Sequence, residues 1–221
     1  HGRFPAREAG DCLQRINSRL EKSVAHLKTT NVLVITWGTA WVYRHRQLGR
    51  VVANCHKFPA TDFERFRLSL EQVYTDLLSR LHSRYPDMRV LLTVSPIRHW
   101  KDGAHANQLS KAVLLLAIDK LKQRLDYVSY FPSYEIVMDE LRDYRFYTED
   151  MLHISPQGIE YIWEKFQSLY MTSATEAWMK RIDKINKTLL HRPADPDSSA
   201  YQELMKKTAQ ERERIERELG I

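Results

Sequence analysis

Long apolar runs and cysteines are both scarce in this sequence. The longest apolar stretch, around Val113–Ile118, is far shorter than the roughly 20 residues of a membrane-spanning helix, so we expect no membrane span. Because only Cys12 and Cys55 are present, a disulfide-stapled scaffold is excluded and a reducing compartment such as the cytoplasm is favoured. Seven glycines and eight prolines in 221 residues exclude a collagen-like or low-complexity chain. The composition therefore predicts a globular protein.

Blocks of basic residues are also missing, although the net charge is positive. The formal charge is +6 and the isoelectric point is about 9.3. No run of five or more Lys or Arg occurs, and acidic residues are interspersed with the basic ones. A dedicated nucleic-acid surface needs basic residues gathered on one face, so we expect no nucleic-acid partner.

Strand-like and helix-like segments alternate along the first 170 residues. Apolar residues at three- and four-residue spacing predict helices, and short β-branched runs predict strands. The predicted helices are Asp11–Lys28, Phe63–Leu81, Asn107–Arg124, Ile136–Leu141 and one that starts at Pro156 with Ser155 as its cap. The predicted strands are Asn31–Thr36, Val51–Ala53, Arg89–Val94 and Asp126–Phe131. This order predicts an α/β domain over residues 1–170, with a mostly parallel sheet and helices on both faces.

The C-terminal residues 171–221 have a different character. Trp178, Ile182, Ile185 and Leu189 lie on one helical stripe, and a highly charged helix is predicted over Tyr201–Leu219. We expect a helical C-terminal extension that packs on the domain or joins chains into a homo-oligomer.

The most polar and aromatic segments follow the predicted strands. They are Trp37-Gly38-Thr39, Asn54-Cys55-His56, Ser95-Pro96-Ile97-Arg98-His99 and Ser133-Tyr134-Glu135. Ligands of parallel α/β sheets bind outside the carboxyl ends of the strands. We therefore expect all four segments to lie along one ligand-binding edge.

An Asp-x-x-His pair precedes the last helix of this domain. Asp150 stands three residues before His153, in a predicted loop just ahead of Ser155. A carboxylate in that position can hold the imidazole Nδ1 and leave Nε2 free as a general base. The alternative is that Asp150 only caps a turn.

Several segments resemble known families. Asp150 and His153, followed by Ser155 and Gly158, are similar to the last motif of the SGNH (GDSL-like) esterases. Segments along nearly the whole chain more closely resemble the GSCFA-domain proteins: Gly38-Thr39-Ala40-Trp41-Val42-Tyr43, Val52-Ala53-Asn54-Cys55-His56-Lys57, Thr93-Val94-Ser95-Pro96-Ile97-Arg98-His99, Asn107-Gln108-Leu109-Ser110-Lys111-Ala112, and Tyr130-Phe131-Pro132-Ser133-Tyr134-Glu135 through Leu141-Arg142-Asp143-Tyr144-Arg145-Phe146.

The resemblance implies a three-layer α/β/α fold of the flavodoxin-like SGNH type and a serine esterase or acyltransferase. The Gly-Ser-Cys-Phe-Ala motif for which the family is named is absent, and the chain begins at His1 without a methionine. The nucleophilic serine is therefore expected upstream of this sequence. A second departure is that Gly38-Thr39-Ala40-Trp41 lacks the amide side chain that the SGNH pattern uses for the oxyanion.

Under this hypothesis His153 and Asp150 are catalytic. Oxyanion and substrate contacts are assigned to Gly38, Thr39, Asn54, His56, Ser95 and His99. Each of these has a structural alternative, since Asn54 could satisfy a turn, Ser95 could belong to a Ser-Pro turn, and the histidines could cap carbonyl groups. The substrate would be a small molecule or glycan that carries an acyl group. No cofactor or metal is expected.

Two other classes stay open. A metal site would need His56, His99, Asp150 and His153 to converge, and no pair among them has the spacing of a strong metal motif. A non-catalytic carbohydrate-binding module is the second alternative, with Trp37, Trp41, Tyr43 and Trp100 as stacking surfaces.

Overall fold

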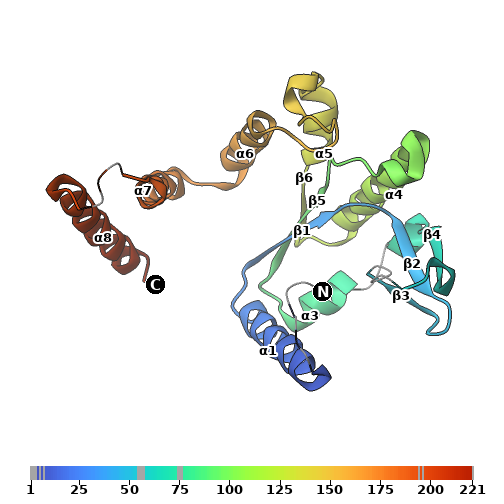
Figure 1. Ribbon diagram of the computed structural model, residues 1–221. Coiled ribbons are helices and arrows are strands. Elements are labelled where there is room, and N and C mark those ends of the chain that lie inside the picture. The colour runs from blue at the N-terminus through green and yellow to red at the C-terminus, as the bar shows by residue number, and fades with distance from the viewer. Residues whose placement is uncertain are drawn as a thin grey trace. The chain divides into compact units, whose positions relative to one another are not determined.

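The protein consists of two compact units, His1–Ile159 and Glu160–Ile221 (Figure 1). The computed structural model describes residue 4, residue 6 and residues 8–53, 58–73, 77–193, 195 and 197–220. Within these ranges no helix is both long enough and apolar enough to cross a membrane.

A three-stranded parallel sheet forms the centre of the first unit. Its strands are β1 (Val32–Trp37), β5 (Arg89–Val94) and β6 (Val128–Phe131), in the order β1-β5-β6. The central strand β5 is buried from Val90 to Val94, as expected for a run of aliphatic residues between two parallel neighbours. The predicted parallel α/β arrangement is confirmed at this level, and β5 has the predicted bounds.

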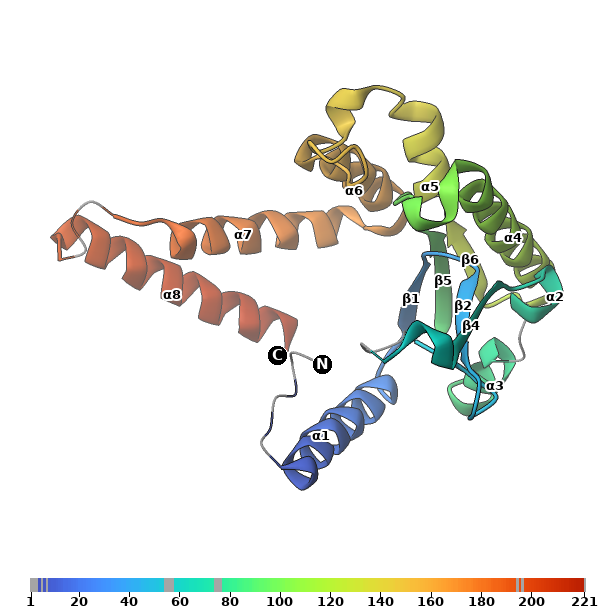
Figure 2. The same cartoon turned by 45° about the vertical axis from the view of Figure 1, so that its right-hand side comes forward.

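Helix α4 (Gly103–Arg124) covers one face of this sheet (Figure 2). Its Leu114, Ile118 and Leu121 pack with Val90, Leu92 and Val94 in the hydrophobic core. The same helix also buries a polar row near its N-terminal end, at Asn107, Ser110 and Lys111.

A separate antiparallel sheet corrects two predictions. Strands β2 (Trp41–His45), β3 (Arg50–Val52) and β4 (Phe63–Arg67) are arranged in the order β3-β2-β4. The predicted parallel strand at 51–53 is thus an antiparallel hairpin strand, and Gly49 takes φ 60° in the turn that leads into it. The predicted helix Phe63–Leu81 is wrong in its first part, because the alternating Phe63-Glu64-Arg65-Phe66-Arg67 pairs with β2. Helices α2 (Leu70–Val73) and α3 (Leu77–Arg84) follow.

The remaining elements of the first unit agree closely with the predicted ones. Helix α1 (Ala9–Leu27) precedes β1, and α5 (Ser133–Glu135) continues into a π-helical turn at Ile136–Glu140. Short 3-10 turns occur at Ala60–Asp62, Trp100–Asp102 and Tyr144–Phe146. Helix α6 (Pro156–Tyr170) starts at the predicted proline, and from Glu160 onward its residues belong to the second unit.

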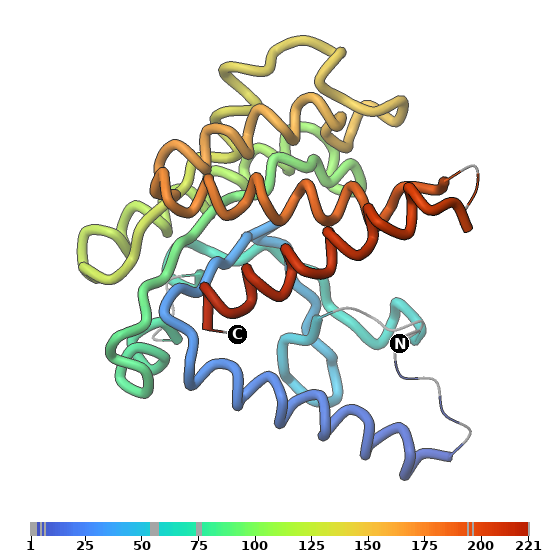
Figure 3. Tube along the Cα trace, turned by 90° about the vertical axis from the view of Figure 1, so that its left-hand side faces the viewer, coloured from blue at the N-terminus to red at the C-terminus, as the bar shows by residue number. Residues whose placement is uncertain are grey.

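The second unit is helical, as predicted for the C-terminal residues. Helices α7 (Ser173–Leu190) and α8 (Ser199–Leu219) lie side by side (Figure 3). Ile185 of α7 and Ile215 of α8 are buried. Arg181 forms ion pairs with Glu211 and Glu218, at 2.7 and 2.9 Å, across the two helices.

Candidate functional site

The loop that carries Asp150 and His153 is a narrow hairpin. Tyr147 and Ile154 form an antiparallel bridge, and the Thr148 N–H donates to the His153 carbonyl at 2.9 Å. Met151, near the tip, has φ 58°, a left-handed conformation that non-glycine residues seldom adopt. The backbone of this loop is therefore held in a specific, unusual shape.

Asp150 organises both the turn and the imidazole. Its Oδ1 accepts hydrogen bonds from the Thr148 hydroxyl and from the N–H groups of Leu152 and His153, at 2.7 to 2.9 Å. Its Oδ2 lies 2.5 Å from His153 Nδ1. These contacts hold the pKa of Asp150 well below its usual range, the His153 N–H contributing most and the imidazole next. Asp150 thus combines the two predicted roles of turn cap and imidazole partner.

The His153 imidazole is held at Nδ1 by Asp150 and is exposed to solvent. About two thirds of its side chain is exposed, and within the described residues its Nε2 has no hydrogen-bond partner. A histidine held through Nδ1 by an ionised carboxylate presents Nε2 as a proton acceptor.

The helix that follows fixes the base of this loop. The Ser155 hydroxyl accepts from the Gly158 N–H at 3.3 Å and donates to the Arg145 carbonyl at 3.1 Å. Gly158 packs so tightly that a Cβ placed there would lie 2.5 Å from Ile154 Cγ2. Ser155 is confirmed as a helix cap, and Gly158 is required by close packing.

Lys111 joins the carboxyl ends of β1 and β5. Its ammonium donates to the carbonyls of Gly38 and Ser95, each at 2.6 Å, and only 1% of the residue is exposed. Asn107, one turn earlier on the same helix, is also buried. Two strand ends of the parallel sheet are therefore held at one buried cation.

The buried position of Lys111 predicts a pH-dependent stability. Burial lowers its pKa to about 8, whereas an unfolded lysine titrates near about 10.4. Between these values the unfolded chain binds more protons, so stability rises with pH in this window and is flat below it. From about pH 7.5 to about pH 9.5 we expect the wild type to gain about 1–2 kcal/mol of unfolding free energy relative to Lys111→Met, measured by urea titration. Parallel pH profiles for the two proteins would contradict this.

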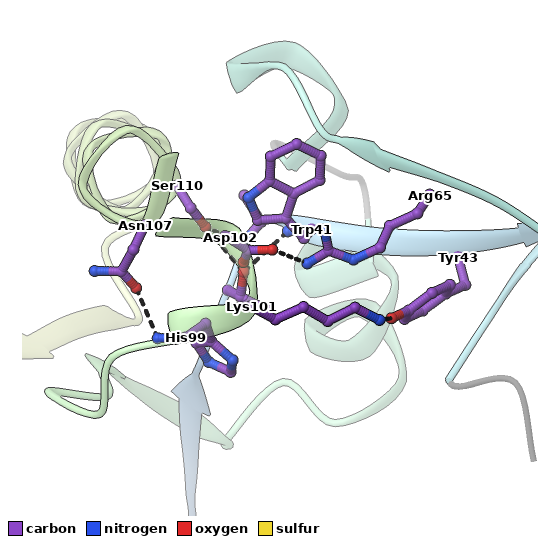
Figure 4. Close-up of polar contacts among 10 residues, drawn as sticks. Trp41, Tyr43, Arg65, His99, Lys101, Asp102, Asn107 and Ser110 are labelled. Atoms are coloured by element: carbon purple, nitrogen blue, oxygen red, sulfur yellow. Dashed lines mark hydrogen bonds and ion pairs between the residues drawn. The ribbon is translucent and has the colours of Figure 1, made fainter. Parts of the chain in front are cut away.

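Polar residues on the same face of α4 hold the two adjoining loops (Figure 4). The Ser110 hydroxyl accepts from the Ala40 N–H at 2.7 Å and lies 3.0 Å from the Thr39 hydroxyl. Asn107 Oδ1 accepts from the His99 N–H at 3.0 Å. Gly38, Thr39, Ser95 and His99, predicted from separate strand ends, are thus brought together by one helix.

His99 lies beside this buried cation. Its pKa is lowered, first by burial and second by the charge of Lys111, so the imidazole is neutral at neutral pH. A Cβ added to Gly38 would lie 3.6 Å from His99 Nε2, which places the ring directly against the β1 end.

A second cluster lies beside His99 and was not predicted. The Asp102 side chain is fully buried and pairs with Arg65, which lies over the ring of Trp41 at 4.5 Å (Figure 4). Lys101 Nζ donates to the Tyr43 hydroxyl at 3.0 Å. The sequence signal was weak, because Arg65 falls in the segment predicted as helix and stands 37 residues before its partner.

The predicted residues fall into two groups within the first unit. Gly38, Thr39, Ser95 and His99 surround the polar row of α4, whereas Asp150 and His153 lie in their own hairpin. The link between them is Arg98, whose guanidinium lies 5.4 Å from the ring centre of Tyr147, at the base of that hairpin. The expected single edge of four strand ends is wrong, since residues 54–56 follow β3 of the other sheet. Asn54 and His56 themselves lie outside the described residues.

In the described part of the chain, no group of three or more His, Cys, Asp or Glu side chains is arranged to hold a metal ion. His56, one of the four residues of the metal hypothesis, is not among the residues covered.

Two protein-family models match this sequence. A model of the GSCFA family matches residues 1–166, about three quarters of the chain. The chain belongs to the GSCFA family. A second model, described as the C-terminal domain of GSCFA domain proteins, matches residues 182–219, which include α8 and part of α7. Comparisons with curated proteins and with solved structures found no match. The GSCFA match covers both the α4 polar row and the Asp150–His153 hairpin.

Proposed function

We propose that this GSCFA protein is a serine esterase or acyltransferase of the SGNH type, acting on an acylated small molecule or glycan. The observation that carries the proposal is the 2.5 Å contact between Asp150 Oδ2 and His153 Nδ1, with Nε2 left open. A carboxylate that is ionised at neutral pH holds the ring in the tautomer that accepts a proton at Nε2.

The proposed reaction follows from this geometry. His153 Nε2 takes the proton of a serine hydroxyl while the serine Oγ attacks the acyl carbonyl carbon. The tetrahedral intermediate collapses, the ester C–O bond breaks, and the leaving alcohol takes the proton from His153. Water or a sugar hydroxyl then attacks the acyl-enzyme, and the same histidine accepts its proton and returns it to the serine.

The proposal places the nucleophilic serine upstream of His1. Two serines near the site have local structural roles, because the Ser95 hydroxyl accepts from the Ile97 N–H at 3.2 Å and Ser155 caps α6. Within the described residues β1 pairs with β5 alone, so its other edge is open to a further parallel strand. A strand added there would extend the sheet toward the proposed three-layer SGNH fold, with its carboxyl end beside Gly38.

The oxyanion is assigned to backbone N–H groups at Gly38 and Thr39. The Gly38 carbonyl and the Thr39 N–H belong to one planar trans peptide group, so they point in opposite directions. Lys111 holds that carbonyl at 2.6 Å and thereby sets the direction of the Thr39 N–H. Loss of one such donor typically costs about 3 kcal/mol in transition-state stabilisation.

Fluorophosphonate labelling tests the proposal. The protein used must include the segment proposed to carry the serine, and peptide mapping locates the adduct. We expect one modified serine upstream of His1. A protein that contains that serine but is not labelled would overturn the proposal and favour the carbohydrate-binding alternative, for which Trp100 is half exposed while the ring of Trp41 lies against Arg65.

A further inference from the structure

A cleft beside the Asp150–His153 hairpin contains one uncompensated cation. The cleft has a volume of about 240 Å³ and lies between the loop after β5 and the segment that follows α5. It is lined by Arg98, Val137, Met138, Leu141, Arg142, Asp143, Tyr144 and Tyr147.

The other two charged residues that line this cleft, Arg142 and Asp143, each have an ion-pair partner. Arg142 contacts the Asp139 carboxylate at 3.1 Å and also donates to the Met138 carbonyl. Asp143 is paired with Arg145 at 3.0 Å, and this contact holds the pKa of Asp143 below its usual range. Neither acid is therefore available to neutralise Arg98.

Arg98 has no such partner. The residue is partly buried and its guanidinium lies over the Tyr147 ring, and within the described residues it makes no hydrogen bond or ion pair. A guanidinium carries five N–H donors in a planar fork that matches a carboxylate or a phosphate. Withdrawing such a group from water without an acceptor is unfavourable, so a bound oxyanion would satisfy it.

The rest of the cleft indicates what the anion is attached to. Val137 and Leu141 are among the lining residues but are almost completely buried, and Tyr144 and Tyr147 supply aromatic surface. We propose that this cleft binds an organic oxyanion, a carboxylate or phosphate monoester on an apolar body, with Arg98 as the anion-binding residue.

This inference rests on the proposed function where it concerns substrate. Tyr147 is the bridge partner of Ile154, the residue next to His153, so an anion held by Arg98 would lie close to the proposed general base. The acyl substrate would then carry a negative charge near its ester group. Alternatively, the acyl group would be attached to a carrier that bears the negative charge.

Binding of small probes to the 221-residue protein tests the site by calorimetry. The probes are phenyl phosphate, benzoate and the neutral benzyl alcohol, and the variants are Arg98→Gln and Arg142→Gln. The second variant is the matched control, because it removes the same charge from the same cleft but takes it from a paired arginine. We expect saturable binding of at least one anion, weakened tenfold or more by Arg98→Gln, about 1.4 kcal/mol, and less than about twofold by Arg142→Gln. If phenyl phosphate binds more tightly than benzoate, the site prefers a phosphate; the opposite order indicates a carboxylate.

Three results would overturn the inference. They are equal anion affinity in Arg98→Gln and wild type, equal binding of benzyl alcohol, or no saturable binding by the wild type up to about 10 mM. Arg98→Lys, which keeps the charge but loses the fork, should give an intermediate loss and serves if Arg98→Gln fails to fold. Because the probes need no serine, absence of fluorophosphonate labelling would contradict the proposed function without affecting this measurement.

Discussion

Replacing His153 with alanine is expected to lower the rate of fluorophosphonate labelling by at least about 10³-fold, because the serine loses its proton acceptor. Stability should change little, since the His153 side chain is two-thirds exposed. The rate is measured on a protein that carries the proposed serine. His105→Ala is the control, as His105 is an exposed histidine on α4.

The variant Asp150→Asn tests whether His153 must be held by a carboxylate, because it keeps the imidazole and removes only its anionic partner. An amide cannot serve as the anionic partner of Nδ1, so we expect a loss of about 10³-fold or more with His153 still in place. Glu149→Gln, which removes the charge of an exposed acid next to Asp150 and outside the cleft lining, should leave labelling near the wild-type rate. Equal rates for Asp150→Asn and Glu149→Gln would contradict the assigned role of Asp150.

Gly158→Ala is expected to have the largest effect on stability. The new Cβ would lie 2.5 Å from Ile154 Cγ2 and 3.1 Å from the Phe146 carbonyl oxygen, so the hairpin would have to shift away from α6. We expect a loss of about 2–3 kcal/mol in unfolding free energy. Urea titration measures it, and slower labelling should accompany it because the displaced strand leads directly to His153.

Two companion variants make this prediction specific. Gly10→Ala introduces the same methyl group into α1, where no atom lies within 4 Å, and should be neutral or stabilising by up to about 1 kcal/mol. Ile154→Leu removes the branched Cγ2 and should restore part of the stability of Gly158→Ala. If Gly158→Ala unfolds at the same urea concentration as the wild type, the close contact is not rigid.

Features that depend on near neighbours in the chain could be predicted from the sequence. Strand β5 has its predicted bounds because a continuous aliphatic run specifies a buried strand by itself. The Ser155 cap and the Asp150–His153 contact join residues three positions apart. Such contacts form when the few residues between the two partners make a turn, so they do not depend on distant segments.

The segment Phe63–Arg67 shows where local reasoning fails. Its apolar positions fit either a helix or a strand, as short segments often do. Pairing with β2, about 20 residues earlier, decides for the strand. The preference of five residues is too small to oppose a complete ladder of hydrogen bonds to a neighbouring strand.

The sequence by itself determined the family, the α/β character, the helical C-terminal residues and the contact between Asp150 and His153. Only the tertiary structure decided which polar residues are buried together. Lys111 lies 73 residues from Gly38, and Arg65 lies 37 residues from Asp102. The same applies to Arg98, whose charge is left uncompensated because the acids near it pair with other arginines. These contacts depend on where distant segments meet once the core has packed, because burial removes water as the competing partner.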